Sequence, residues 1–184
     1  MPPDQEPRTA DSKRPGHAGA KRTVGLQLLV LLGFLAASAL VAGLGGLATA
    51  TNVNGWYVTA DKAPWSPPNW LFGPVWTILY IAMAVAAWLV WRRRDARTRP
   101  ALLAYAVQLV LNLLWTPAFF GLYPTLGTPA LWIGFTIIVA LIIMVTVTVL
   151  RFGPISRAAG FLMLPYLSWL VFASSLNLWA ALNN

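Results

Sequence analysis

Three side chains between residues 101 and 119 have the types and the spacing of a binding site. Gln108, Asn112 and Trp115 follow one another at steps of four and three, so they share one face of a helix. Two amides beside an indole can hydrogen-bond the polar edge of a ligand and stack on its ring. The amides can equally hydrogen-bond a neighbouring helix, which is common in membrane bundles. The pattern leaves both interpretations open and favours the second.

Aromatic side chains form two further stripes at helical spacing. One stripe consists of Asn69, Phe72, Trp76, Tyr80 and Met83, and the other of Tyr166, Trp169, Ala173 and Asn177. A single stripe of this kind more often packs against a helix than lines a ligand site. The ligand interpretation gains support if the three stripes converge on one place. The small Ala173 beside Trp169 would leave room for a ligand there.

Ordinary catalytic and metal chemistry has few residues to use. The chain has no Cys, its single His is His17, and its long apolar runs contain no charge. A thiol nucleophile and a zinc–thiolate site are therefore excluded. A proton-coupled pump or ion exchanger is disfavoured, because charges within spans usually mark such paths. We expect no metal site and no obligatory cofactor, and a tetrapyrrole would bind by stacking and shape rather than by His or Cys ligation.

The elements that position these side chains are predicted to be membrane-spanning helices. Of 184 residues, 58% are hydrophobic and 10% are charged, whereas about a quarter are charged in a typical soluble domain. Crossing a bilayer takes about 20 mostly apolar residues. Such runs occupy residues 24–47, 71–91, 101–119, 129–150 and 158–181. We expect an all-α integral membrane protein, with a five-helix bundle over residues 23–184.

The basic residues predict the orientation of this bundle. Twelve of the 13 Lys and Arg residues lie in the N-terminal tail or in the segments after the second and fourth spans, and only Lys62 lies on the other side. Cytoplasmic loops are the ones enriched in Lys and Arg. We therefore expect a multi-pass protein of a bacterial cytoplasmic membrane, with its N-terminus cytoplasmic and its C-terminus outside. We expect no nucleic-acid partner.

Two further predictions concern the N-terminal part of the chain. Residues 1–22 are charged and rich in Pro and Gly, and we predict a disordered basic tail. Ala48-Thr49-Ala50 has the composition of a signal-peptide cleavage site. The apolar run before it has about 24 residues, however, against about 7–15 in signal peptides, so we predict that the first span is retained.

The ten tryptophans are distributed unevenly across the predicted bilayer. An interfacial aromatic belt would favour neither side. Two, Trp88 and Trp91, lie at the inner end of the second span, and Trp169 lies roughly mid-membrane. The other seven lie toward the outer side: Trp56, Trp65, Trp70, Trp76, Trp115, Trp132 and Trp179. The excess indicates an aromatic cluster in the outer half, suited to a flat, apolar ligand. The Pro-rich, aromatic segment 63–70 is predicted to fold over the outer helix ends as a lid, and Pro117 and Pro165 should kink their spans.

Three separate motifs resemble one known family. The motifs are Gly55-Trp56-Tyr57 followed by Trp65-Ser66-Pro67-Pro68-Asn69-Trp70-Leu71-Phe72-Gly73-Pro74-Val75-Trp76, then residues 108–121, then residues 165–177. Together they resemble the tryptophan-rich sensory protein family (TspO/MBR), which includes the mitochondrial translocator protein. The resemblance covers residues 24–180.

The resemblance implies a five-helix bundle, a homodimer, and a pocket for porphyrins, haem and other aromatic ligands under the first outer loop. By motif position the ligand-binding residues would be Trp65, Trp76, Asn112, Trp115, Trp169 and Ala173, with Tyr80 and Tyr166 nearby; Gln108 joins them by its helical face. The ligand would be protoporphyrin IX or haem. A light-dependent porphyrin breakdown attributed to some members would use Trp76 and Trp169.

Two departures from the family pattern affect what can be carried over. Lys62-Ala63-Pro64 has one residue more than the Lys-Pro pair of many members. The sterol-recognition motif of the mitochondrial relatives needs a Tyr and then a basic residue, and residues 176–184 contain neither. This absence puts sterol binding in doubt.

Three functions remain after these observations. The first is a receptor or sensor for flat amphipathic ligands. The second is a transporter of the same molecules, against which stands the lack of inverted repeats and of a coupling-ion site. The third is a light-dependent porphyrin-degrading protein, for which the spans offer no acid–base pair or activated nucleophile.

Overall fold

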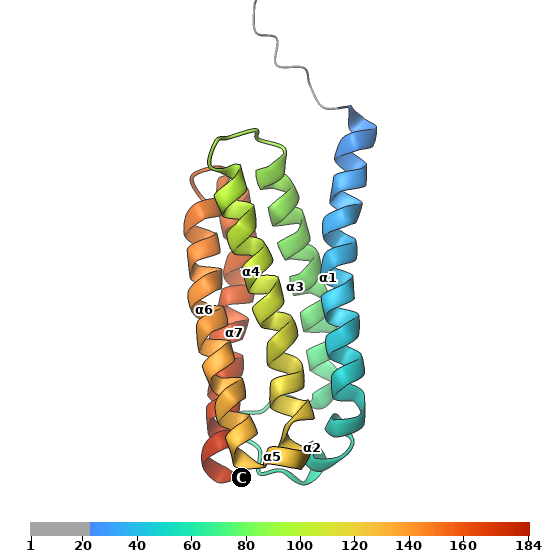
Figure 1. Ribbon diagram of the computed structural model, residues 1–184, viewed down its shortest axis with the longest axis vertical. Helices are drawn as coiled ribbons and strands as arrows, with labels where there is room; N and C mark the ends of the chain where they lie inside the picture. The colour runs from blue at the N-terminus through green and yellow to red at the C-terminus, as the bar shows by residue number, and fades with distance from the viewer. Residues whose placement is uncertain (1–22) are drawn as a thin grey trace, which may run out of the picture.

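The computed structural model describes residues 23–184, so the tail predicted for residues 1–22 lies outside the described residues. Five long helices are apolar and long enough to cross a membrane, and they run alternately up and down along one axis (Figure 1). They are α1 (Val24–Val53), α3 (Asn69–Trp91), α4 (Thr98–Thr116), α6 (Thr128–Phe152) and α7 (Arg157–Asn183). The predicted all-α five-helix fold is confirmed, and no strand occurs within residues 23–184.

Three short helical segments complete the architecture. They are α2 (Trp56–Thr59), the π-helical turn η1 (Pro117–Gly121) and α5 (Tyr123–Leu126). The π turn begins at Pro117, where the kink was predicted, and the Leu122 amide donates to the Pro117 carbonyl at 3.1 Å. Pro165, by contrast, lies within the continuous helix α7. Regular helix is what a bilayer demands, because no water there satisfies the backbone.

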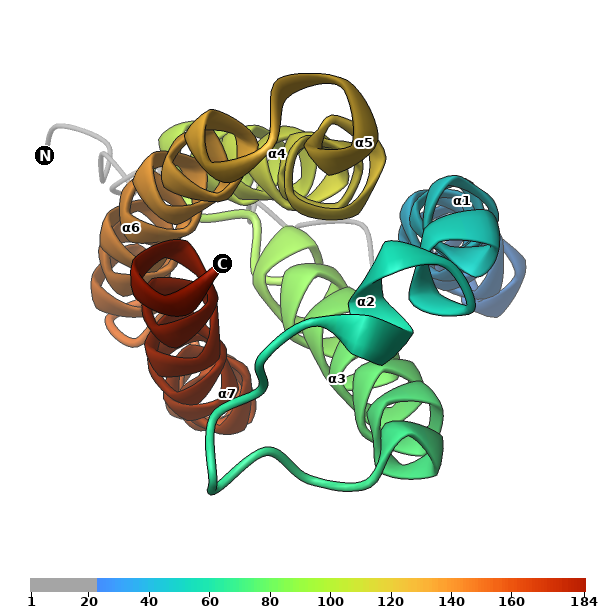
Figure 2. The ribbon, with the colours of Figure 1, turned by 90° about the horizontal axis from the view of Figure 1, so that it is seen from below.

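The helices differ in how deeply they are packed. Helix α6 packs mainly against α7 and α4, and α1 packs mainly against α3. Fully buried apolar side chains, among them Met83, Leu131, Ile138, Leu141 and Leu170, form the core. Helix α1 lies at the edge of the bundle (Figure 2), and only 17% of its apolar window is buried. Most of α1 is therefore available to lipid.

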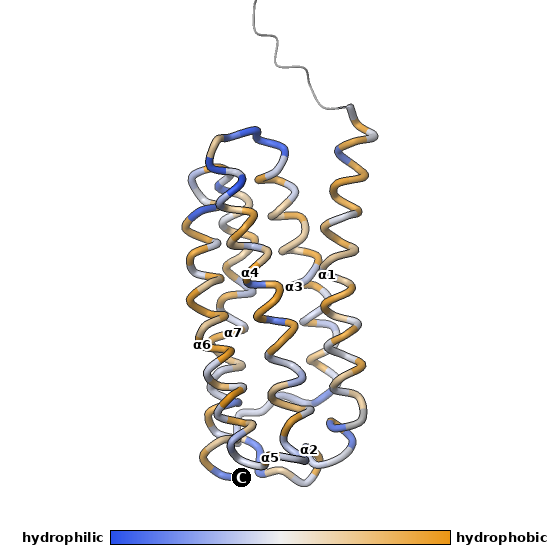
Figure 3. Tube along the Cα trace, in the orientation of Figure 1, coloured by the Kyte–Doolittle hydropathy of each residue, from blue (hydrophilic) through white to orange (hydrophobic). Residues whose placement is uncertain are grey.

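The two ends of the bundle carry different charges. We call one the arginine end; its α3–α4 and α6–α7 connections and the adjoining helix ends carry Arg92, Arg93, Arg94, Arg97, Arg99, Arg151 and Arg157. The opposite end, here the Lys62 end, carries Asp61 and Lys62. The tube in Figure 3 is polar at the α3–α4 loop and apolar along most of the helical length. This separation is the one that the charge pattern predicts; the side of the membrane that each end faces stays a prediction.

Local contacts order the α3–α4 loop at the arginine end. Arg97 pairs with Asp95 at 2.6 Å. Hydrogen bonds from the Arg97 side chain and backbone lower the Asp95 pKa to about 2. The Arg92 guanidinium lies 4.7 Å from the Trp88 ring centroid. Trp88 itself donates to the Gln27 carbonyl of α1 at 3.0 Å, so this tryptophan ties α3 to α1.

Candidate ligand-binding site

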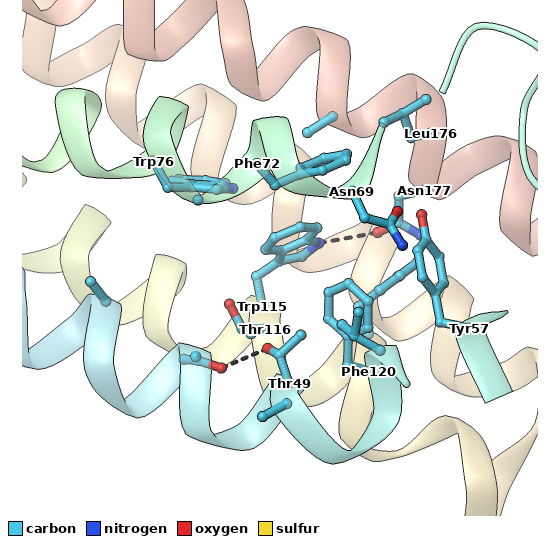
Figure 4. Close-up of a pocket in the computed structure, with 18 of the residues that line it drawn as sticks. Thr49, Tyr57, Asn69, Phe72, Trp76, Trp115, Thr116, Phe120, Leu176 and Asn177 are labelled. Atoms are coloured by element: carbon cyan, nitrogen blue, oxygen red, sulfur yellow. Dashed lines mark hydrogen bonds between the residues drawn. The ribbon is translucent and has the colours of Figure 1, made fainter. Parts of the chain in front are cut away.

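A cavity of about 480 Å³ lies toward the Lys62 end, between α1, α3, the α4–η1 junction and α7 (Figure 4). Its size falls within the range of about 300–1,000 Å³ typical of small-molecule pockets. Four residues predicted for the site line it: Trp76, Tyr80, Trp115 and Ala173.

Helix α1 supplies the small side of the cavity. Its lining residues are Ala42, Gly45, Gly46, Thr49, Ala50 and Val53. A methyl group at Gly45 would lie 3.4 Å from the Thr116 Oγ1 atom, so α1 and α4 approach closely there. Small residues permit close approach between membrane helices, and along the rest of this face they leave room beside the aromatic wall opposite.

The aromatic wall is a series of neighbouring rings, one pair stacked and two pairs tilted. Trp115 stacks on Phe119, with ring centroids 5.9 Å apart and planes 23° apart. Trp76 lies 6.3 Å from Trp115 at 34°, and 5.6 Å from Tyr80 at 31°. The first two contacts join α3, α4 and η1. A flat conjugated ligand can add to such a series by offset stacking.

Two amides, Asn112 outside the cavity lining and Asn177 within it, hold this wall in place. Tyr80 donates its hydroxyl proton to Asn112 Oδ1 at 2.6 Å, and Asn112 Nδ2 donates to the Tyr166 hydroxyl at 2.7 Å. Trp115 Nε1 donates to Asn177 Oδ1 at 3.1 Å, and Asn177 Nδ2 donates to the Leu131 carbonyl at 2.9 Å. The two amides thus join α3, α4, α6 and α7. Buried polar networks that are fully paired hold their members in one position.

Asn112 and Gln108 themselves do not line the cavity. Asn112 is 1% exposed and is paired with both tyrosines. Gln108 is fully buried, with Nε2 3.6 Å from Met83 Sδ and with no hydrogen-bond partner for Oε1. Asn112 therefore forms hydrogen bonds between helices, which is the second of the two interpretations of this helical face. A direct ligand contact for either amide stays a prediction.

The three other predicted residues lie around the cavity rather than in its lining. Tyr166 is fully buried, 6.1 Å from Trp76 between ring centroids. Trp169 packs on Phe72, which lines the cavity, at 5.8 Å, and its buried Nε1 has no partner within the described residues. Trp65 packs on Trp179 at 5.3 Å and donates to Ser175 Oγ at 3.2 Å. Trp169 therefore stands behind Phe72, and Trp65 covers the end of α7.

The lid segment is tied down at several points. Seen from the Lys62 end, the chain crosses from α2 to α7 before it turns back to α3 (Figure 2). Asn184 accepts a hydrogen bond from the Asp61 amide at 2.8 Å and donates one to the Asp61 carbonyl at 3.1 Å. With the Trp65–Ser175 bond, these contacts hold the segment against the end of α7, as the prediction of a lid requires.

The sequence prediction missed several lining residues. Tyr57, Phe119 and Phe120 line the cavity from outside the predicted stripes, and Asn177 lies in a predicted stripe but was not assigned to the site. Trp56 stacks on Tyr123 with centroids 3.8 Å apart and donates to the Phe120 carbonyl at 3.0 Å, which ties α2 to η1. The signal was present in the Gly55-Trp56-Tyr57 motif, but nothing in it specified that Tyr57 turns inward.

Fold and cavity together define a class: a multi-pass helical membrane protein with an aromatic-walled pocket near one end. Within residues 23–184 no three His, Cys, Asp or Glu side chains gather into a possible metal site. The sequence pattern of the TspO/MBR family matches residues 34–182. The chain belongs to this family.

Individual relatives support the same assignment. The chain is similar to the tryptophan-rich protein TspO of Chlorobaculum tepidum, at 41% identity over 66% of this chain and 75% of that protein. It is 35% identical to the translocator protein of Ovis aries, over 66% and 70%. It is also 35% identical to the tryptophan-rich sensory protein of Cereibacter sphaeroides, over 80% and 87%.

Proposed function

We propose that this protein is a membrane receptor that binds porphyrins, haem and related flat amphipathic molecules in the cavity between α1, α3, η1 and α7. The observation that carries the proposal is the series of neighbouring rings along one wall, Tyr80, Trp76, Trp115 and Phe119, of which the last two are stacked and the others are tilted by 31–34°, opposite the small residues of α1. The rings on one side offer stacking area, and the small residues on the other side leave space. This arrangement suits a planar ligand better than a globular or highly charged one.

Haem and metal-free porphyrin are both compatible with this wall. The lining holds no His or Cys, so the binding energy would come from stacking and burial of the macrocycle. Membership of a family whose relatives are named sensory and translocator proteins supports the receptor role. The homodimer implied by the family resemblance stays a prediction.

Substituting Trp76 tests this proposal. Purified protein in detergent or nanodiscs is titrated with protoporphyrin IX, and binding is followed by the visible absorption of the porphyrin. Trp76→Phe should weaken binding about fivefold, because it removes roughly 1 kcal/mol of stacking. Trp132→Phe is the matched control, since Trp132 is 43% exposed and lies outside the cavity lining. Equal affinities for both variants and the parent protein would contradict the proposal.

A light-dependent breakdown of the bound porphyrin is the second candidate. What favours it is that Trp76, one of the two tryptophans involved, faces the cavity, while Trp169 contacts the cavity-lining Phe72. Illuminating the complex and watching for a new absorption spectrum tests this activity. A transporter is distinguished by flux of the ligand into sealed vesicles.

A further inference from the structure

The cavity lining contains no charged side chain. An ionised carboxylate buried without a partner costs several kcal/mol, so it would not be placed among these rings. A flat ligand that carries carboxylates on one edge must therefore keep that edge at the mouth of the cavity. The groups available at the mouth then decide whether an acidic ligand is preferred over a neutral one.

One cation is placed to meet such an edge. Tyr57 lines the cavity, and the Lys62 ammonium lies 5.1 Å from the centroid of the Tyr57 ring. Among residues 23–184, the other cationic side chains, all arginines, lie at the arginine end. Lys62 is half-buried, and its Nζ donates to the Val58 carbonyl at 3.4 Å. These are weak contacts, of the kind that a four-carbon side chain can exchange for an ion pair.

The backbone at Lys62 is fixed although the side chain is long. The preceding residue, Asp61, forms two backbone hydrogen bonds with the Asn184 side chain, and Trp65 is bonded to Ser175 three residues later. Lys62 therefore stands between two anchored points and stays close to Tyr57. The anchored loop fixes the position of the Lys62 backbone, and the long side chain allows the ammonium to reach the mouth of the cavity.

We propose that Lys62 recognises the carboxylate edge of a flat ligand at the mouth of the cavity and thereby sets a preference for acidic over neutral ligands. This inference rests on the proposed function and names the chemical class of ligand that the same site selects. Asp61, the acidic neighbour, opposes the attraction. Because Asn184 binds the backbone of Asp61, Asp61→Asn removes the opposing charge and leaves both of those hydrogen bonds available.

The test compares protoporphyrin IX with its dimethyl ester, which keeps the macrocycle and lacks the two carboxylates. Lys62→Gln should weaken binding of the acid about fivefold, the size expected of one half-exposed ion pair, and should leave binding of the ester unchanged. Lys62→Arg keeps the charge and should bind the acid as the parent protein does. Asp61→Asn should bind the acid more tightly than the parent protein. Arg157→Gln is the matched control, because it removes the same charge at the arginine end.

Each result has one meaning. If Lys62→Gln weakened binding of the acid and of the ester equally, the role of Lys62 would be structural only, and the inference would be overturned. No change in either affinity would overturn it as well. If the parent protein bound neither the acid nor the ester, the proposed function itself would be contradicted. A fivefold loss confined to the acid would establish the preference. Added salt should reduce this difference between the parent protein and Lys62→Gln, because it screens the ion pair that only the parent protein forms.

Discussion

At the scale of single residues, Asn112 acts as a connector between three helices. Its side chain accepts from Tyr80 on α3 and donates to Tyr166 on α7, and all three groups are buried. Tyr80 also lines the cavity. The cavity wall therefore depends on Asn112 through the position of Tyr80, although Asn112 itself does not line the cavity.

Removing this connector should cost stability as well as binding. Asn112→Ala leaves two buried hydroxyls without their partner, and hydrogen bonds between membrane helices contribute about 1 kcal/mol. We expect a lower melting temperature in detergent, followed by circular dichroism, and weaker porphyrin binding. Thr136→Val is the control, because the exposed Thr136 hydroxyl bonds only to the Trp132 carbonyl of its own helix. A melting temperature equal to that of the control would contradict the connector role.

The residue scale also shows where prediction from the sequence stops. Gln108, Asn112 and Trp115 do lie on one buried face of α4, as their spacing predicts. Seven residues of helix extend about 10 Å along the axis, however, and only Trp115 reaches the level of the cavity. Helical periodicity gives the face of a residue but not the depth at which a neighbouring helix leaves space.

At the scale of elements, the lid segment depends on a contact that no local pattern announces. The Asn184 side chain bonds both backbone groups of Asp61, although the two residues are 123 positions apart. The Thr128 hydroxyl in turn donates to the Asn184 carbonyl at 2.6 Å. Pro67-Pro68 predicts a rigid, non-helical loop, but only the folded bundle brings the end of α7 beneath it.

Asn184→Ala should loosen this loop. Two hydrogen bonds of about 1 kcal/mol each close the contact, so hydrogen exchange at the Asp61 amide should speed up roughly tenfold or more. Asn183→Ala is the matched control, because the Asn183 side chain donates to the Trp179 carbonyl within α7. The measurement is hydrogen–deuterium exchange on the peptide that contains Asp61. Similar exchange in both variants would show that the loop is held by other contacts.

The elements themselves were largely predictable, and their ends were not. Hydropathy and charge placed all five long helices, since a bilayer permits few alternatives to regular helix. Helix α1 nevertheless continues to Val53 rather than ending at Leu47, and its last turns line the cavity with Thr49, Ala50 and Val53. The end of an apolar run marks where the bilayer ends, whereas a helix ends where its backbone finds other partners.

At the scale of the whole molecule, charge and cavity occupy opposite ends. The arginines gather at one end, and the cavity, Lys62 and the lid lie toward the other. The separation itself followed from the sequence, because 12 of the 13 basic residues fall in three segments that are two spans apart along the chain and therefore lie on the same side. The cavity did not, because it arises where the small face of α1 meets the rings of α3 and η1, and neither face specifies its partner.

The absence of Cys from the chain allows a clean test of which end faces the cell interior. Single cysteines are introduced as Val58→Cys, exposed at the Lys62 end, and Pro154→Cys, exposed in the α6–α7 connection. If the arginine end is cytoplasmic, as the excess of Arg there predicts, a membrane-impermeant maleimide should label Val58→Cys in intact cells. It should label Pro154→Cys only after permeabilisation. The reverse pattern would invert the orientation and would open the cavity toward the cytoplasm, so a receptor would sample ligands made inside the cell. Labelling of both variants in permeabilised cells serves as the control for accessibility.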